Sequence, residues 1–327
     1  MQQYFGAAMK ILAVDDNLLT LDLLGTLAAQ LGFRDLNTAS SGHEAFQILR
    51  SEGEIYDCLL FDISMAGMDG IELCSLVRAL PAYQMTPIIM LTSMVEKDYV
   101  DRAFKAGATD YATKPFHIAE LGARLRMAQE LIAARRSKAL ARTAAAKPVS
   151  SHSFGLADDI AIDGFAGLIR YTALGNYLLQ LSKARLAGTQ VLAVKIDQIE
   201  TIYAQATSAE FVYAISEVAD ALCGRLCAVQ PMMAYAGNGV FLIVLSGTVN
   251  VSPDVLELDV QNLLDERNSE HDNGTPLDLD VSFGNPIVPH INSTLPAWSI
   301  FDRAIARAES RSAQKQNQSP KTLLQVL

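Results

Sequence analysis

The chain has 327 residues, of which 50% are hydrophobic and 19% are charged, and its formal net charge at pH 7 is −10. This length exceeds that of one ordinary domain, and the apolar content suffices for two cores. The acidity argues against broad nucleic-acid binding, although a local basic helix can escape that average. No apolar stretch approaches the roughly 18 residues of a membrane helix, so we expect a cytoplasmic protein without membrane contact.

Short apolar runs alternate with stretches of helical spacing over the first 115 residues. The runs predict strands at 10–14, 57–61 and 87–91, and helical spacing occupies 18–31 and 71–80. This alternation predicts an α/β fold with a doubly wound parallel sheet that helices cover on both faces. The carboxyl ends of parallel strands face one crevice, so residues far apart in the sequence meet there.

Polar residues stand where these strands end: Asp15 and Asp16, Asp62, Thr92 and Lys114. Mg²⁺ prefers oxygen ligands such as clustered carboxylates, and phosphoryl transfer is catalysed mainly by positioning and charge neutralisation. We therefore expect Asp62 to be the nucleophile that forms an aspartyl-phosphate, with Lys114 and Thr92 binding phosphoryl oxygens. Singly, these residues have ordinary explanations as helix caps or solvated surface charges. In this order and at strand ends, they favour a phosphoryl-acceptor site.

The sequence around these residues resembles the receiver domain of two-component response regulators. The matching segments are Val14-Asp15-Asp16, Asp62 followed by Met65-Ala66-Gly67-Met68-Asp69-Gly70, Leu91-Thr92-Ser93, and Gly107-Ala108-Thr109-Asp110-Tyr111-Ala112-Thr113-Lys114-Pro115-Phe116. The resemblance covers roughly residues 9–130 and implies a five-stranded, flavodoxin-like sheet. One departure is Ala66, where the family usually has a proline.

The resemblance also implies specific roles around Asp62. Asp16 is expected to bind Mg²⁺ directly and Asp15 largely through water, while the backbone carbonyl of Ser64 completes the metal site. Tyr111 is expected to be the aromatic switch residue that responds to Thr92. The bond between Lys114 and Pro115 is expected to be cis, which an X-Pro bond allows at low cost.

The region after the first domain predicts a long helix and then a linker. From Ile118 the apolar spacing follows a three-four rhythm, and strong helix formers continue it to residue 146. The segment that starts at Lys147-Pro148 ends this helix. We place the receiver domain at 9–130, a helical extension and linker at 131–158, and an output domain at 159–316.

The output region predicts an α+β domain with a largely antiparallel sheet. The expected elements are a helix at 169–186, a strand at 190–196, a helix at 209–229, a hairpin at 232–245, a helix at 253–264, a strand at 277–283 and a helix at 298–312. The hairpin has the strongest local signal, because Asn238-Gly239 lies between two apolar runs.

This order is similar to that of the GGDEF domain of diguanylate cyclases, a nucleotidyl-cyclase-like fold. Three segments carry the resemblance: Asp163-Gly164-Phe165-Ala166-Gly167-Leu168, Ala236-Gly237-Asn238-Gly239-Val240 in place of the signature Gly-Gly-Asp-Glu-Phe, and Val281-Ser282-Phe283-Gly284. The cyclase needs carboxylates for two metals and a triphosphate. Here Asn238 and Gly239 replace the signature acids, and Lys195 replaces a metal-binding aspartate, which leaves Asp197 nearby. At the positions where the family recognises guanine, this chain has Tyr203 and Val212. At the positions that bind the inhibitory product, it has Cys227 and Gln230 in place of the usual arginine and aspartate.

These features predict a response regulator that is not itself an enzyme. A histidine kinase or histidine phosphotransfer protein would phosphorylate Asp62, Thr92 would move inward and Tyr111 would follow. The remodelled face would favour homodimerisation or contact with a protein effector through a degenerate, catalytically inactive GGDEF-like domain. One alternative is that this domain retains nucleotide binding or diguanylate cyclase activity through Asp197. Another is DNA binding by a C-terminal helix that carries Arg303, Arg307 and Arg311.

Overall fold

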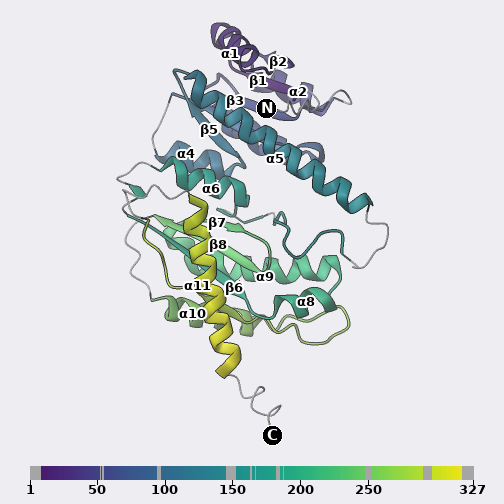
Figure 1. Ribbon diagram of the computed structural model, residues 1–327, viewed down its shortest axis with the longest axis vertical. Helices are drawn as coiled ribbons and strands as arrows, with labels where there is room; N and C mark the ends of the chain where they lie inside the picture. The colour runs from purple at the N-terminus through teal and green to yellow at the C-terminus, as the bar shows by residue number, and fades with distance from the viewer. Residues whose placement is uncertain are drawn as a thin grey trace, which may run out of the picture. The chain divides into compact units, whose positions relative to one another are not determined.

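The structure is a computed structural model that divides into two compact units, Met1–Lys147 and Pro148–Leu327 (Figure 1). It describes residues 9–51, 53, 55–93, 97–144, 152–162, 164–165, 167–181, 185–186, 188–246, 252–289 and 297–318. Over these ranges, no helix has both the length and the apolar character of a membrane span. Positions 163 and 166 of the GGDEF-like opening segment, and 145–151 of the predicted linker, lie outside the described residues.

The first unit contains a five-stranded parallel sheet in the order β2-β1-β3-β4-β5. Its strands are β1 (Ile11–Val14), β2 (Leu36–Ala39), β3 (Cys58–Asp62), β4 (Ile88–Thr92) and β5 (Asp110–Thr113). Its helices are α1 (Leu18–Gln30), α2 (Gly42–Arg50), α3 (Gly70–Arg78), α4 (Lys97–Lys105) and α5 (Ile118–Ala144), with a 3-10 turn η1 (Pro81–Tyr83). The predicted flavodoxin-like parallel sheet is therefore confirmed.

Burial explains why three of these strands could be predicted from the sequence. Every residue of β1, β3 and β4 is buried, as befits central parallel strands covered on both faces. One core cluster joins alternate residues of these strands, such as Ile11 and Ala13, to Leu24 of α1 and Leu125 of α5. Strand β2 was not predicted, because it exposes its two middle residues and lacks a continuous apolar run.

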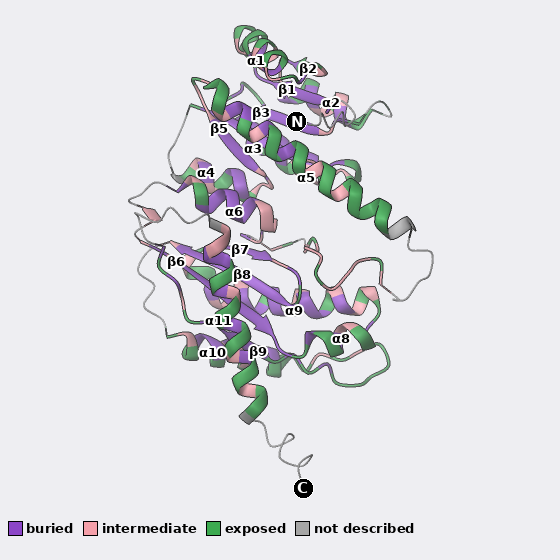
Figure 2. Cartoon of the chain, viewed as in Figure 1, coloured by how far each residue is buried: buried purple, intermediate pink, exposed green. Residues whose placement is uncertain are grey.

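The second unit contains a four-stranded antiparallel sheet in the order β7-β8-β6-β9. Its strands are β6 (Thr189–Ile196), β7 (Met232–Tyr235), β8 (Val240–Ser246) and β9 (Val281–Phe283). Its helices are α6 (Tyr171–Gln180), α8 (Ile199–Gln205), α9 (Ser208–Leu226), α10 (Pro253–Arg267) and α11 (Ala297–Gln318), with a 3-10 turn η2 (Cys227–Val229). Buried residues line this sheet as they do the first one (Figure 2).

The Asn-Gly hairpin is confirmed, since β7 and β8 pair as antiparallel neighbours on either side of the turn. Gly237, Asn238 and Gly239 all have positive φ values, of 86°, 51° and 69°. This left-handed region is the one that Asn and Gly tolerate best.

Several predicted boundaries in the second unit were wrong. The helix expected at 169–186 ends at Gln180, because Leu181 turns to an extended conformation and its side chain is buried. The helix expected to reach residue 229 ends at Leu226, where a 3-10 turn begins. The strand expected from residue 277 starts only at Val281. These changes follow tertiary packing, which overrides a local spacing pattern.

Candidate functional site

Four adjacent parallel strands bring the predicted site residues to one edge of the sheet. Asp15 directly follows β1, Asp62 and Thr92 are the last residues of β3 and β4, and Lys114 directly follows β5. The register aligns these ends, because Asp62 pairs with Leu91 and Thr92 with Thr113. Convergence at this edge is the expected property of an open parallel sheet.

Three carboxylates form the centre of this site. Asp15, Asp16 and Asp62 each offer an oxygen, and these oxygens lie within 4.8 Å of one another. Asp15 and Asp62 are buried, whereas Asp16 is exposed. The backbone N–H of Asn17 donates to Asp15 Oδ1 at 2.9 Å, and that of Ala66 donates to Asp16 Oδ2 at 3.1 Å. The backbone therefore holds two of the three carboxylates in place.

Lys114 links the two buried carboxylates. Its Nζ lies 2.7 Å from Asp15 Oδ2 and 2.8 Å from Asp62 Oδ1. Burial raises the pKa of Asp62 above its ordinary value, although the hydrogen bond from Lys114 opposes this rise. Burial also works against the Lys114 ammonium, but its bonds with Asp15 and Asp62 prevail and raise the pKa of Lys114. The site thus holds three acids against one cation and can accept a further positive charge.

Thr92 and Tyr111 occupy neighbouring strands beside this cluster, and both are buried. The Lys114 backbone N–H donates to the Thr92 carbonyl at 2.7 Å, which joins the ends of β4 and β5. The Tyr111 ring meets Phe104 of α4 edge-on, with ring centroids 6.3 Å apart. The peptide bond between Lys114 and Pro115 is cis, as the resemblance implied. Ser64 is exposed in the loop after β3, and the metal-binding role of its carbonyl stays a prediction.

Two residues that were not predicted as site residues also support the site. Asn17 caps α1, because its side chain accepts from the Leu19 N–H at 3.0 Å, and so orients the segment that carries Asp15 and Asp16. Gly70 begins α3 directly against the end of β3, where an added Cβ would lie 2.0 Å from the carbonyl oxygen of Asp62. The N-cap pattern at Asn17 was a detectable signal, whereas the close approach at Gly70 was not.

Comparison with known proteins agrees with this geometry. The family described as "Response regulator receiver domain" matches residues 11–126. Residues 11–126 form a receiver domain. The signal transduction histidine-protein kinase BarA of Escherichia coli (strain K12) is 37% identical over 108 residues, which are 33% of this chain and 11% of BarA. The transcriptional regulatory protein YvrH of Bacillus subtilis (strain 168) is 35% identical over 116 residues, which are 36% of this chain and 47% of YvrH.

Solved structures are also similar to part of this chain. The receiver domain of a sensor histidine kinase from Pseudomonas aeruginosa PAO1, with a magnesium ion coordinated in its active-site cleft, is 30% identical. The match covers 39% of this chain and 99% of that one, with a TM-score of 0.35. Chemotaxis protein CheY4 of Vibrio cholerae is 29% identical over 38% of this chain and 99% of its own, with a TM-score of 0.34. The curated relatives are matched over less than half their length, so their whole activities do not transfer to this chain.

The hairpin of the second unit has a different character. Lys195 is buried, and its Nζ donates to the Asn238 carbonyl at 2.5 Å and lies 3.7 Å from Glu200 Oε1. Asp197 faces β9 and α11 instead, where its Oδ2 accepts from Ser282 Oγ at 2.9 Å and lies 3.5 Å from Lys315 Nζ. Within the described ranges, the receiver site is the one group of three acidic, histidine or cysteine residues close enough to share a metal ion.

We predict that replacing Gly70 with alanine displaces the end of β3 and with it Asp62. Overpacking of this kind costs about 1–3 kcal/mol of unfolding free energy, measured by chemical denaturation. Gly25→Ala in α1 is the matched control, because its Cβ would meet no atom within 4 Å. That change should stabilise the helix by about 0.5–1 kcal/mol. Equal effects of the two substitutions would contradict the close approach at Gly70.

Proposed function

We propose that this protein is a response regulator that accepts a phosphoryl group on Asp62 and passes the signal to a protein partner. The observation that carries the proposal is the Lys114 ammonium, bonded at once to Asp15 and Asp62 in a cluster of three carboxylates. Receiver domains exchange phosphoryl groups with histidine kinases or phosphotransfer proteins. We propose one of these as the donor to Asp62.

The donor set fits Mg²⁺, which prefers carboxylate and carbonyl oxygens and keeps several waters. Asp16, Asp62 and the Ser64 carbonyl would hold the ion, with Asp15 contributing mainly through water. Bound Mg²⁺ supplies charge neutralisation for the phosphoryl oxygens and for the crowded carboxylates. This accords with the raised pKa of Asp62, because nearby positive charge lowers the pKa of a buried carboxylate.

The chemical step is attack by an Asp62 oxygen on phosphorus while the bond from phosphorus to the donor nitrogen breaks, the electron pair leaving with the nitrogen. Lys114 already contacts Asp62 and can follow the charge onto the transferred group, where it would bind a phosphoryl oxygen. The Thr92 hydroxyl would donate to a second oxygen, and the buried Tyr111 ring would move toward the space that Thr92 leaves. The face around β4, β5 and α4 would then favour homodimerisation or effector binding.

We propose that the second unit is a degenerate GGDEF-like domain whose output is contact with a protein effector. The helix, strand and hairpin order supports this, and so does Lys195, whose ammonium holds the hairpin turn where the cyclase needs a metal-binding carboxylate. The remaining acid, Asp197, is bonded to Ser282 on the neighbouring strand. A two-metal reaction lacks its ligands in this arrangement.

The first prediction concerns the phosphorylated residue. Incubation of the protein with Mg²⁺ and acetyl phosphate should add one hydroxylamine-labile phosphoryl group, measured by intact-protein mass spectrometry. Asp62→Asn should abolish this label. Asp69→Asn is the matched control, because Asp69 caps α3 nearby and asparagine caps equally well. Continued labelling of the Asp62 variant would refute the assignment.

The second prediction concerns the surface that meets the phosphodonor. Helix α1 begins just after Asp16 and exposes Leu18, Leu19 and Leu23 by 65%, 78% and 47%. Exposed apolar groups beside a reactive site indicate a binding surface. Leu19→Ala should slow transfer from a phosphorylated histidine kinase about tenfold, as expected for a contact worth about 1.4 kcal/mol.

The same Leu19 variant should accept phosphate from acetyl phosphate at the wild-type rate, because the small donor needs no docking surface. Leu258→Ala on α10, which is 61% exposed, is the control and should behave as wild type with both donors. If Leu19→Ala slowed both donors equally, the residue would affect the acceptor site and not docking.

The third prediction is that the second unit makes no cyclic di-GMP. With beryllofluoride bound as a phosphoryl mimic, the protein should convert GTP no faster than a Lys195→Ala, Asp197→Ala double variant, measured by chromatography of the products. The reason is electrostatic, since a triphosphate with two Mg²⁺ ions requires several close carboxylates. Turnover above that of the double variant would establish the alternative, a functional cyclase.

A further inference from the structure

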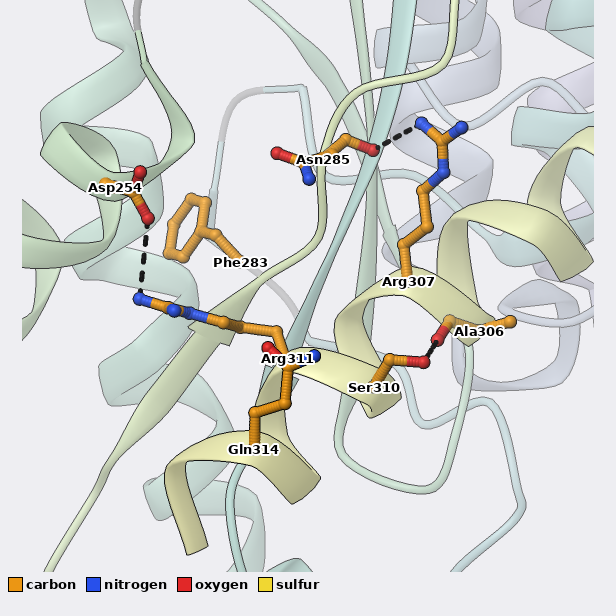
Figure 3. Close-up of a pocket in the computed structure, with 8 residues that line it drawn as sticks. All are labelled: Asp254, Phe283, Asn285, Ala306, Arg307, Ser310, Arg311 and Gln314. Atoms are coloured by element: carbon orange, nitrogen blue, oxygen red, sulfur yellow. Dashed lines mark hydrogen bonds and ion pairs between the residues drawn. The ribbon is translucent and has the colours of Figure 1, made fainter. Parts of the chain in front are cut away.

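A polar cavity of about 570 Å³ lies in the second unit, bounded by α10, the segment after β9, and α11. Its walls include Asp254, Asn285, Arg307, Ser310, Arg311 and Gln314 (Figure 3). The volume falls within the range of small-molecule sites, but the lining is polar where such sites are usually apolar. Charge and hydrogen bonding must therefore determine what the cavity accepts.

Arg307 contributes a positive charge that its neighbours do not neutralise. Its Nη1 donates to the backbone carbonyls of Asn285 at 3.0 Å and Pro286 at 2.7 Å. Among the described residues, no carboxylate lies within ion-pair distance of this guanidinium. The two carbonyls orient the group beside the cavity and leave its net charge in place.

Arg311 lies one helical turn further along α11 and is held by a buried acid. Its Nη2 is 3.0 Å from Glu257 Oε1, and Glu257 in turn accepts from the Phe283 N–H at 2.8 Å. Arg311 Nη2 also lies 3.4 Å from Asp254 Oδ1, whose side chain is 79% exposed. A surface pair of this kind is weak. An incoming anion can therefore replace Asp254 while Glu257 keeps Arg311 in position.

We propose that this cavity binds a small phosphorylated ligand, with its phosphate at Arg307 and its polar remainder reaching Arg311. Arg307 and Arg311 lie one turn apart on α11, and Figure 3 shows them directed apart, Arg307 toward Asn285 and Arg311 toward Asp254, so a ligand that spans the cavity can meet both. Guanidinium groups suit phosphate because their N–H groups match its oxygens in pairs. The Ser310 hydroxyl and the Asn285 and Gln314 amides can then bond the polar remainder of the ligand. This site is separate from the hairpin and from the phosphoryl acceptor Asp62.

Calorimetric titration of the full chain with inorganic pyrophosphate, and separately with AMP, tests the proposal. Mg²⁺ is omitted so that the acidic receiver site does not gather phosphate. Saturable one-site binding is expected, and Arg307→Ala should weaken it about tenfold or more. Arg303→Ala is the matched control, because it removes the same charge from the same helix without touching the cavity. This control should bind as wild type.

Asp254→Asn should change the affinity in the opposite direction from Arg307→Ala. It removes the acid that competes with the ligand for Arg311, so both probes should bind several-fold more tightly. Thermal unfolding of each unliganded variant checks that it is folded. The proposal is overturned if neither probe binds saturably, if Arg303→Ala weakens binding as much as Arg307→Ala, or if Asp254→Asn weakens it. Binding of pyrophosphate and AMP alike identifies phosphate as the recognised group, whereas binding of AMP alone identifies a nucleotide.

Discussion

The contact of one ammonium with two buried carboxylates underlies the receiver domain. Lys114 lies 2.7 Å from Asp15 and 2.8 Å from Asp62, and without it the two acids would face each other in a poorly solvated pocket. The cost of burying a carboxylate appears as the raised pKa of Asp62. The sheet can place three acids together because it also places this lysine, and the excess negative charge leaves the site able to receive a metal ion.

Lysine has a different effect in the second unit. Lys195 donates to a backbone carbonyl of the hairpin turn, and Asp197 bonds to Ser282 and approaches Lys315. Asp197 is thus held by residues of β9 and α11, whereas the turn is bonded to Lys195. The role proposed for this unit is contact through its surface or binding of a ligand. The cavity beside Arg307 and Arg311 offers such a role within an otherwise acidic protein.

Long-range polar pairs also connect α11 to the rest of the second unit. Arg311 and Lys315 both approach Glu257, and Lys315 donates to the carbonyl of Val281 at 2.8 Å. These bonds tie the C-terminal helix to α10 and β9, and so define one wall of the cavity. From the sequence, the basic residues of this helix were compatible with DNA binding. In the structure, some of them form contacts within the second unit.

The sequence by itself determined the elements with strong local signals. Fully buried strands such as β3 read as continuous apolar runs, the Asn238-Gly239 turn favours a left-handed backbone, and Asp15, Asp62 and Lys114 stand at strand ends. Tertiary structure alone decided the half-exposed β2, the early end of α6, and two of the contacts between distant residues. The approach of Gly70 to the Asp62 carbonyl and the bond of Asp197 to Ser282, 85 residues away, have no local signature. Such contacts arise from packing, which depends on the whole chain and not on any short segment of it.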